Sequence, residues 1–241
     1  SSSTAKTYCD VITDYEQTCI DAIRATGGNN ELRYIMVPGY DASGTDQTML
    51  GTYTMPTDTA DDKLILSTHA YSPYAFAMYD SNDADHTDFT STDKSSLDTI
   101  FSYLKTNYTS QGIGVVMGEA SASDKDNLED RIEWAEYYFE KALDAGIPVV
   151  LWDNMVTISN GGTLSSGECH GYLNRNACEW YFPTLVQSMM DTVGVTGYSI
   201  PYYVAATADS IGWDSRSATT ITTTSTELTW STETCCKLDK S

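Results

Sequence analysis

Four short apolar segments, separated by stretches with helical periodicity, constrain the fold of this chain more than any other feature. They span residues 33–37, 63–68, 113–117 and 147–152. Strands that are apolar on both faces and alternate with helices form parallel sheets. The sequence therefore predicts an α/β protein, either open and doubly wound or part of a barrel.

The intervening stretches predict helices over residues 14–26, 96–105, 126–145 and 180–193. In the second of these, apolar residues recur at positions i, i+3, i+4 and i+7, which gives one apolar helix face. In the third, Asp126 and Glu129 are spaced to form a capping box, and Gly146 ends the helix. Each helix would cover a strand of the predicted sheet.

The C-terminal region differs in composition from the rest of the chain. Residues 215–234 contain 13 Ser or Thr among 20 residues, which is typical of a linker or an O-glycosylated stalk. Because Thr also favours strands, an added β-ribbon is the alternative. We therefore predict a globular region over residues 1–200 and a Thr/Ser-rich tail over residues 201–241.

Charge and apolar content restrict the partners. Thirteen Lys and Arg against 34 Asp and Glu give a net charge of −21, which repels nucleic acids and anionic membranes. No apolar run reaches the roughly 18 residues that a membrane-spanning helix needs. The sequence begins SSSTAK, without Met or a signal peptide, so we expect it to be processed or cut from something longer.

The six cysteines indicate an oxidising compartment. Their count is even, none forms a CxxC pair and the three histidines are scattered, so we expect no metal site. Cys169 and Cys178 are close enough in sequence for a local disulfide, with buried thiols as the alternative. The sequon that begins at Asn107 is compatible with secretion, and we predict an extracellular protein.

Chemically versatile side chains follow the four predicted strands. The first strand leads to Tyr40, the second to His69 and Tyr71, the third to Glu119, and the fourth to Trp152 and Asn154. The C-terminal ends of parallel strands meet at one edge of the sheet, where α/β enzymes place their active sites. The chain has neither a phosphate-binding glycine loop nor a GxSxG elbow, which argues against nucleotide-binding and α/β-hydrolase functions.

Four segments carry a family resemblance. The stretches RYIMVPGYDASGT, LILSTHAYSPYAFAM, GVVMGEASASDKDN and RIEWAEYYFEKALDAGIPVVLWDN occur in this order. Together they resemble glycoside hydrolase family 5, in particular the secreted endo-1,4-β-glucanases of anaerobic, plant-degrading microbes. The resemblance implies a (β/α)8 barrel that hydrolyses β-1,4-glucan with retention and without a cofactor.

The resemblance also implies roles for individual residues. Glu119 is similar to the family nucleophile, and His69 and Tyr71 are similar to the pair that orders the site beside it. Trp152 is similar to the platform under a sugar ring. We assign Trp152, Asn154 and Tyr40 to substrate binding.

One family motif is missing. The general acid/base belongs to an Asn-Glu-Pro motif, whereas Asn30-Glu31 is followed by Leu32 and precedes a strand. The chain therefore resembles the barrel from its fourth to its eighth helix, a half-barrel without a general acid/base. We expect the isolated chain to be a weak or inactive hydrolase that needs the N-terminal half-barrel or a second copy. The alternative is a non-catalytic carbohydrate-binding or assembly module.

Overall fold

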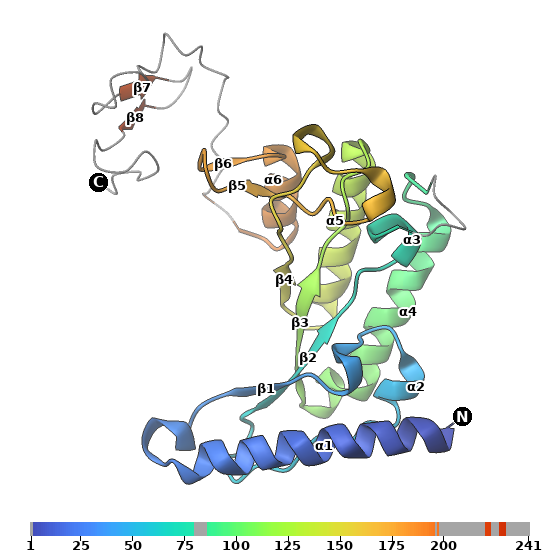
Figure 1. The fold of residues 1–241 in the computed structure, drawn as a ribbon, viewed down its shortest axis with the longest axis vertical. Helices are drawn as coiled ribbons and strands as arrows, with labels where there is room; N and C mark the ends of the chain where they lie inside the picture. The colour runs from blue at the N-terminus through green and yellow to red at the C-terminus, as the bar shows by residue number, and fades with distance from the viewer. Residues whose placement is uncertain (1, 80–85, 196, 198–219, 223–226, 230–241) are drawn as a thin grey trace.

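Four parallel strands form the central sheet of the computed structural model, which describes residues 2–79, 86–195, 197, 220–222 and 227–229 (Figure 1). The strands are β1 (Ile35–Val37), β2 (Leu64–His69), β3 (Gly114–Ala120) and β4 (Val149–Leu151). Their order in the sheet is β1-β2-β3-β4, and every neighbouring pair is parallel. All four predicted strands are confirmed, and the sheet is made of consecutive strand–helix units.

Four longer helices accompany the sheet: α1 (Ser2–Ala25), α4 (Ser91–Asn107), α5 (Leu128–Asp144) and α6 (Pro183–Thr192). Helix α1 begins well before the predicted residue 14, because Ala5 and Cys9 continue the buried face that carries Ile20. Helix α6 begins later than predicted, because Glu179–Trp180 form strand β6, which pairs with β5 (Leu173–Asn174).

Shorter elements connect these units. They are η1 (Gly28–Glu31), η2 (Tyr40–Ala42), α2 (Gln47–Leu50), α3 (Tyr74–Ala77), η3 (Thr109–Gln111), η4 (Ile158–Asn160) and η5 (Leu164–Ser166). The predicted capping box of α5 is absent, because Asp126 adopts a left-handed conformation and Asn127 is the N-cap residue. A capping box is present instead at the start of α4, between Thr90 and Asp93.

The hydrophobic core lies between the sheet and helices α4 and α5, which run along one side of the strands in Figure 1. It combines strand residues with the apolar stripes of both helices, among them Leu66, Val115, Met117, Leu97, Phe101, Leu104, Trp134 and Tyr138. Burial of this many large side chains is the main stabilising contribution to the fold.

Within the described residues, the opposite face of the sheet is exposed. Met36 in β1 is 59% exposed and Val150 in β4 is 52% exposed, whereas Val149 and Leu151, on either side of Val150, pack against the core. Among the described strands, β1 and β4 each have one neighbour in the sheet, so both edges of the described sheet are open. An exposed apolar sheet face with unpaired edges is rare in a stable monomer, because it favours association with another chain.

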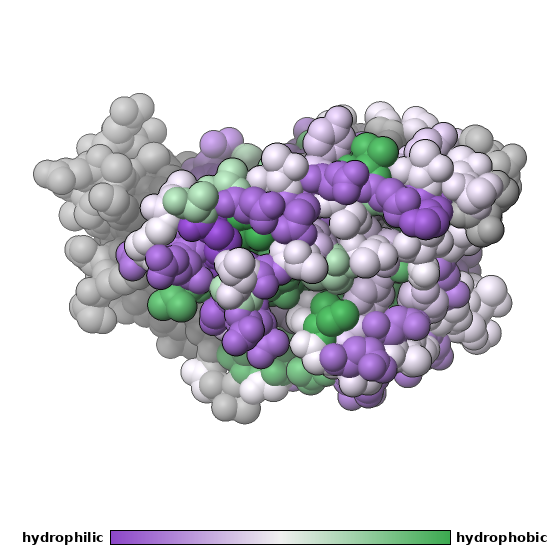
Figure 2. Space-filling view, turned by 90° about the horizontal axis from the view of Figure 1, so that it is seen from below, coloured by the Kyte–Doolittle hydropathy of each residue, from purple (hydrophilic) through white to green (hydrophobic). Residues whose placement is uncertain are grey.

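Helix α1 carries a second exposed apolar stripe, formed by Tyr8, Val11 and Tyr15. These positions are three and four residues apart and therefore share one side of the helix. The lower side of the molecule, along which α1 lies, is otherwise mostly hydrophilic or intermediate, with separate hydrophobic residues (Figure 2). The stripe is thus a second exposed apolar feature, on the first helix.

Most of the predicted tail lies outside the described residues, as does the predicted boundary at residue 200. Within it, β7 (Thr220–Thr222) and β8 (Glu227–Thr229) pair as an antiparallel ribbon. Among the helices of the described ranges, none combines the length and hydrophobicity that crossing a membrane requires.

The predicted disulfide between Cys169 and Cys178 is not formed in the structure. The Cys169 thiol is buried and donates to the carbonyl oxygen of Thr163 at 3.7 Å, while the Cys178 thiol donates to that of Arg175 at 3.8 Å. Proximity in sequence did not bring the two sulfurs together, because the β5–β6 hairpin begins between them. Cys235 and Cys236 lie outside the described residues.

Candidate active site

Glu119 lies near the C-terminal end of β3, with its side chain 33% exposed. A register shift between β2 and β3 places it: Thr68 pairs with Met117, but His69 pairs with Glu119, so Gly118 is skipped. Such bulges redirect side chains and are common beside active sites. The irregularity brings the carboxylate level with the imidazole of His69.

Gly118 leaves room at the bulge for two neighbouring side chains. A β-carbon at this position would lie 2.7 Å from Oγ of Ser67 and 3.4 Å from ring atoms of His69. The Ser67 hydroxyl would have to turn away, and the His69 ring would be in close contact with the new carbon. The sequence signal for this constraint was the glycine directly before Glu119, although its reason emerges only from the structure.

Tyr71 is bonded directly to Glu119. Its hydroxyl donates a hydrogen bond to Oε2 of Glu119 at 2.7 Å. Two residues of α5 hold the segment that carries Tyr71: Trp134 donates its indole N–H to the carbonyl of Ser72 at 2.9 Å, and the Tyr138 hydroxyl donates to that of Ala70 at 3.0 Å. The backbone on both sides of Tyr71 is thus held in place, which the sequence did not reveal.

His69 approaches the same carboxylate oxygen. Its Nδ1 is 3.5 Å from Oε2 of Glu119, within the range of an ion pair when the imidazole is protonated. The structure therefore brings His69, Tyr71 and Glu119 together at the C-terminal ends of β2 and β3. Residues i and i+2 at the end of a strand point the same way, which is why the sequence predicted this pairing.

The electrostatics of the site favour a protonated Tyr71. Partial burial raises the pKa of Tyr71 well above its usual value, and the hydrogen bond to Glu119 together with the charge of that carboxylate raises it further. Glu168 is a further carboxylate whose charge raises the Tyr71 pKa. The phenol consequently keeps its proton and remains a hydrogen-bond donor to Glu119 at any ordinary pH.

Trp152 lies on the uncovered face of the sheet, one residue beyond β4, and is 41% exposed. Its backbone N–H donates to the carbonyl of Ala120 at 3.1 Å, which joins it to the strand end that carries Glu119. The position is open to a flat ligand surface, since aromatic rings at exposed clefts offer an apolar face and a wet N–H.

Asn154 braces a loop. Its Nδ2 donates to the carbonyl of Glu168 at 2.7 Å, and its Oδ1 accepts from the backbone N–H groups of Val156 at 3.0 Å and His170 at 3.2 Å. The amide therefore ties the loop after β4 to the segment that approaches Tyr71. These long-range partners could not be read from the sequence.

Tyr40, which was predicted to bind substrate, packs against helix α1. It lies in η2 after β1, and its ring stacks on Tyr8 of α1 with centroids 5.6 Å apart and planes 14° apart. Its ring is partly buried and also packs against the core. Within the described residues, no group of three or more His, Cys, Asp or Glu side chains is placed to hold a metal ion.

The sequence and the fold have counterparts among known proteins. The chain is 43% identical to Endoglucanase A of Clostridium longisporum over 183 residues, and 38% identical to Endoglucanase 1 of Ruminococcus albus over 179 residues. These matches cover 75% and 74% of this chain but only 33% and 41% of the relatives. The chain thus spans less than half the length of the curated relatives it matches.

Solved structures likewise match most of this chain but only about half of their own length. A GH5-4 broad-specificity endoglucanase from Ruminococcus flavefaciens superimposes with a TM-score of 0.71 at 41% identity, covering 77% of this chain and 52% of that one. A second from Ruminococcus champanellensis, solved with bound cellotriose, gives 0.67 at 38% identity, covering 75% of this chain and 49% of that one. These likenesses confirm the predicted fold class, a portion of a (β/α)8 barrel.

The family model described as cellulase, glycosyl hydrolase family 5, matches residues 1–157 of the 241. This range includes β1 to β4 and therefore His69, Tyr71, Glu119 and Trp152. The chain belongs to glycosyl hydrolase family 5, the cellulase family.

Proposed function

We propose that the chain is the nucleophile-bearing half of a retaining β-1,4-glucanase. The observation that carries the proposal is the contact between the Tyr71 hydroxyl and Glu119 at the open end of the parallel sheet. The substrate class is supported by a relative solved with cellotriose and by a Caldicellulosiruptor lichenase mutant solved with cellotetraose, which is 34% identical to this chain with a TM-score of 0.68.

In the proposed reaction, Glu119 attacks the anomeric carbon. His69 and Tyr71 both contact Oε2, so we assign the attack to Oε1. A carbon–oxygen bond to Glu119 forms as the glycosidic bond breaks, and a general acid protonates the departing oxygen. Water, deprotonated by the same acid/base, then displaces Glu119 and releases the sugar with retained configuration. The hydrogen bond from Tyr71 holds Oε2 and thereby orients the Glu119 carboxylate for the first step.

The acid/base is proposed to come from a companion half-barrel. Retaining enzymes place their two carboxyl groups about 5 to 5.5 Å apart, and Asn-Glu-Pro does not occur in this chain. The uncovered sheet face and the exposed stripe of α1 are where four further strand–helix units would pack. Loss of a general acid/base typically slows catalysis about 10²- to 10⁴-fold, so we propose that the isolated chain is impaired.

We propose that Trp152 stacks against a sugar ring. In a completed barrel, Trp152→Ala is expected to weaken cello-oligosaccharide binding and to lower the chemical rate. Without the indole, the sugar ring would be held less tightly and would be poorly oriented for attack. The thermal midpoint should change little, since the side chain is largely outside the core. Oligosaccharide kinetics and calorimetry on one preparation measure both effects.

Leu143→Ala is the matched control for this prediction, because Leu143 is an exposed apolar residue near the end of α5. A collapsed midpoint for Trp152→Ala, with normal hydrolysis by the remaining folded protein, would assign Trp152 to the core. We further propose that Asn154 and Tyr40 contribute to binding indirectly, by holding the loops after β4 and β1.

A non-catalytic carbohydrate-binding module is the second candidate, and the exposure of Trp152 is the observation that favours it. Such a module would bind cello-oligosaccharides but, unlike the proposed hydrolase, would gain no activity from a companion. Titration calorimetry with cellotetraose, combined with an assay after addition of the N-terminal half of a family 5 endoglucanase, separates the two functions.

We propose that the protein is secreted. Its acidic composition supports this, as does the exposed side chain of Asn107 at the last position of α4. Since α4 leads back to the start of β3, Asn107 lies at the opposite end of the sheet from Glu119, where a glycan would not obstruct the site. When the protein is secreted from yeast, treatment with peptide-N-glycosidase F should lower its mass. The mass of Asn107→Gln, produced in the same way, should not change on this treatment. An unchanged mass of the wild-type protein would contradict glycan addition at Asn107.

A further inference from the structure

A buried histidine lies directly behind Tyr71 and has no part in the hydrolytic steps. His170 is 0% exposed, and its ring centroid is 5.5 Å from that of Tyr71, with the planes tilted by 56°. Burying a polar ring costs free energy unless its nitrogens find partners, so its surroundings indicate what the residue does there.

Ser121 anchors the imidazole. Nδ1 of His170 lies 2.9 Å from Oγ of Ser121, and this oxygen lies 3.0 Å from the hydroxyl of Tyr172. All three side chains are buried, and Ser121 follows Glu119 by two residues. The imidazole is therefore tied to the same backbone segment that carries Glu119.

The contact with Ser121 is what holds the ring of His170. Its other nitrogen, Nε2, has no hydrogen-bond partner among the described residues, and Oε2 of Glu168 is 4.0 Å from it. Burial, helped by the charge of Arg131, lowers the pKa of His170 to about 4, so the ring is neutral near pH 7.

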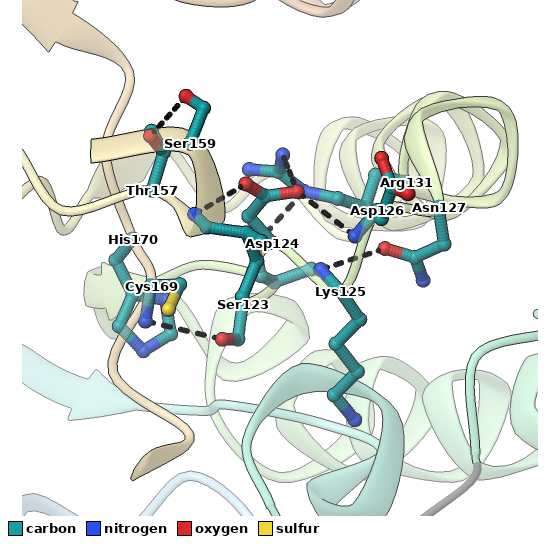
Figure 3. A network of polar contacts seen from close by, with 12 residues as sticks. Ser123, Asp124, Lys125, Asp126, Asn127, Arg131, Thr157, Ser159, Cys169 and His170 are labelled. Carbon is teal, nitrogen blue, oxygen red and sulfur yellow. Dashed lines mark hydrogen bonds and ion pairs between the residues drawn. The ribbon is translucent and has the colours of Figure 1, made fainter. Parts of the chain in front are cut away.

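The segment that carries His170 is fixed to the loop after β3. Cys169 donates its N–H to Oγ of Ser123 at 3.1 Å and accepts from the N–H of Asp124 at 2.7 Å (Figure 3). Asp124 in turn accepts from the N–H of Ile158 at 3.0 Å and lies 3.6 Å from the buried guanidinium of Arg131. His170 thus has little freedom to move relative to Glu119.

We propose that His170 is a positioning residue: anchored on Ser121, it holds the Tyr71 ring where the phenol reaches Oε2 of Glu119. Without this support the ring could rotate or tilt, and the hydrogen bond to the nucleophile would lengthen or break. The role of the bond in catalysis rests on the proposed function, but the positioning is measurable in the full chain without any turnover.

The pKa of Tyr71 is the direct readout. The full chain is labelled with tyrosine carrying ¹³C at Cζ, titrated by NMR, and the Tyr71 signal is assigned with Tyr71→Phe. In the wild type, Tyr71 should titrate well above the ordinary value of about 10. His170→Ala and Ser121→Ala should each lower this pKa by about one unit, a tenfold change in the dissociation constant.

Thr157→Ala is the matched control, because Thr157 is equally buried in the loop after β4 and its hydroxyl contacts Ser159. It should leave the Tyr71 pKa unchanged. His170→Phe, which restores a ring but not the anchor, should give a smaller decrease than His170→Ala. If His170→Ala does not fold, Ser121→Ala and His170→Phe decide the question.

An unchanged Tyr71 pKa in folded His170→Ala and Ser121→Ala would overturn the proposal, as would a wild-type Tyr71 that titrates at its ordinary value. Failure of the proposed function would look different: a completed wild-type barrel would not hydrolyse an aryl cellobioside, while the tyrosine titrations would still give the predicted order.

Discussion

In a barrel completed by a companion half, Glu119→Gln is expected to reduce turnover of an activated aryl cellobioside about a thousandfold or more. Glutamine retains the size and the oxygen that accepts from Tyr71 but cannot form the glycosyl–enzyme bond. A thousandfold loss corresponds to about 4 kcal/mol of barrier. Substrate binding, measured by calorimetry with cellotetraose, should change little. The assay is release of the aryl alcohol under saturating substrate.

Azide provides a second test of the role of Glu119. In Glu119→Ala, azide can enter the space left by the missing side chain and attack the sugar directly, giving a glycosyl azide of inverted configuration. Glu140→Gln is the matched control, because Glu140 is an exposed carboxylate on α5, and it should retain full activity. Retention of more than about a tenth of the activity by Glu119→Gln would refute the assignment, since it corresponds to less than about 1.4 kcal/mol.

The second large effect concerns the uncovered face of the sheet. Expressed alone, residues 1–241 should self-associate or bind the dye ANS, because Met36 and Val150 are exposed and the edges of β1 and β4 have no partner strand among the described residues. Adding the N-terminal half of Endoglucanase A from Clostridium longisporum should abolish dye binding and raise hydrolysis at least about a hundredfold, the lower end of a general acid/base contribution.

Light scattering, calorimetry and the aryl cellobioside assay measure these outcomes on one sample. The proposed architecture would be contradicted if the chain alone were a monodisperse monomer that melts cooperatively and did not bind the added half. A variant of the added half with Gln in place of the Glu in Asn-Glu-Pro should restore the assembly without restoring activity. This separates completion of the barrel from supply of the acid/base.

The strands could be predicted because they are continuous apolar runs, which local sequence reveals directly even though one face of the sheet is exposed in this structure. The start of α1 could not, since its first turns carry few apolar residues and only Ala5 and Cys9 join the buried face. The turn at Asp126 was also missed, because a left-handed conformation is uncommon at a non-glycine residue and no sequence pattern marked it here.

The pairing of His69 and Tyr71 was predictable from their spacing at a strand end, and their contact with Glu119 follows from neighbouring parallel strands. The bulge at Gly118 was not, because a register shift depends on packing between strands. Nor were the partners of Asn154 and His170, which lie 14 and 49 residues away in sequence. Long-range contacts between loops produce no periodic pattern in the sequence from which they could be predicted.

The bonds from Trp134 and Tyr138 to the carbonyls flanking Tyr71 have a consequence for engineering by recombination. They make helix α5, which follows β3, a support for the loop that follows β2. A chimera whose crossover point falls between β2 and α5 would pair one parent's tyrosine with the other parent's scaffold. Gene segments exchanged among relatives should therefore carry β2 through α5 as one inherited block.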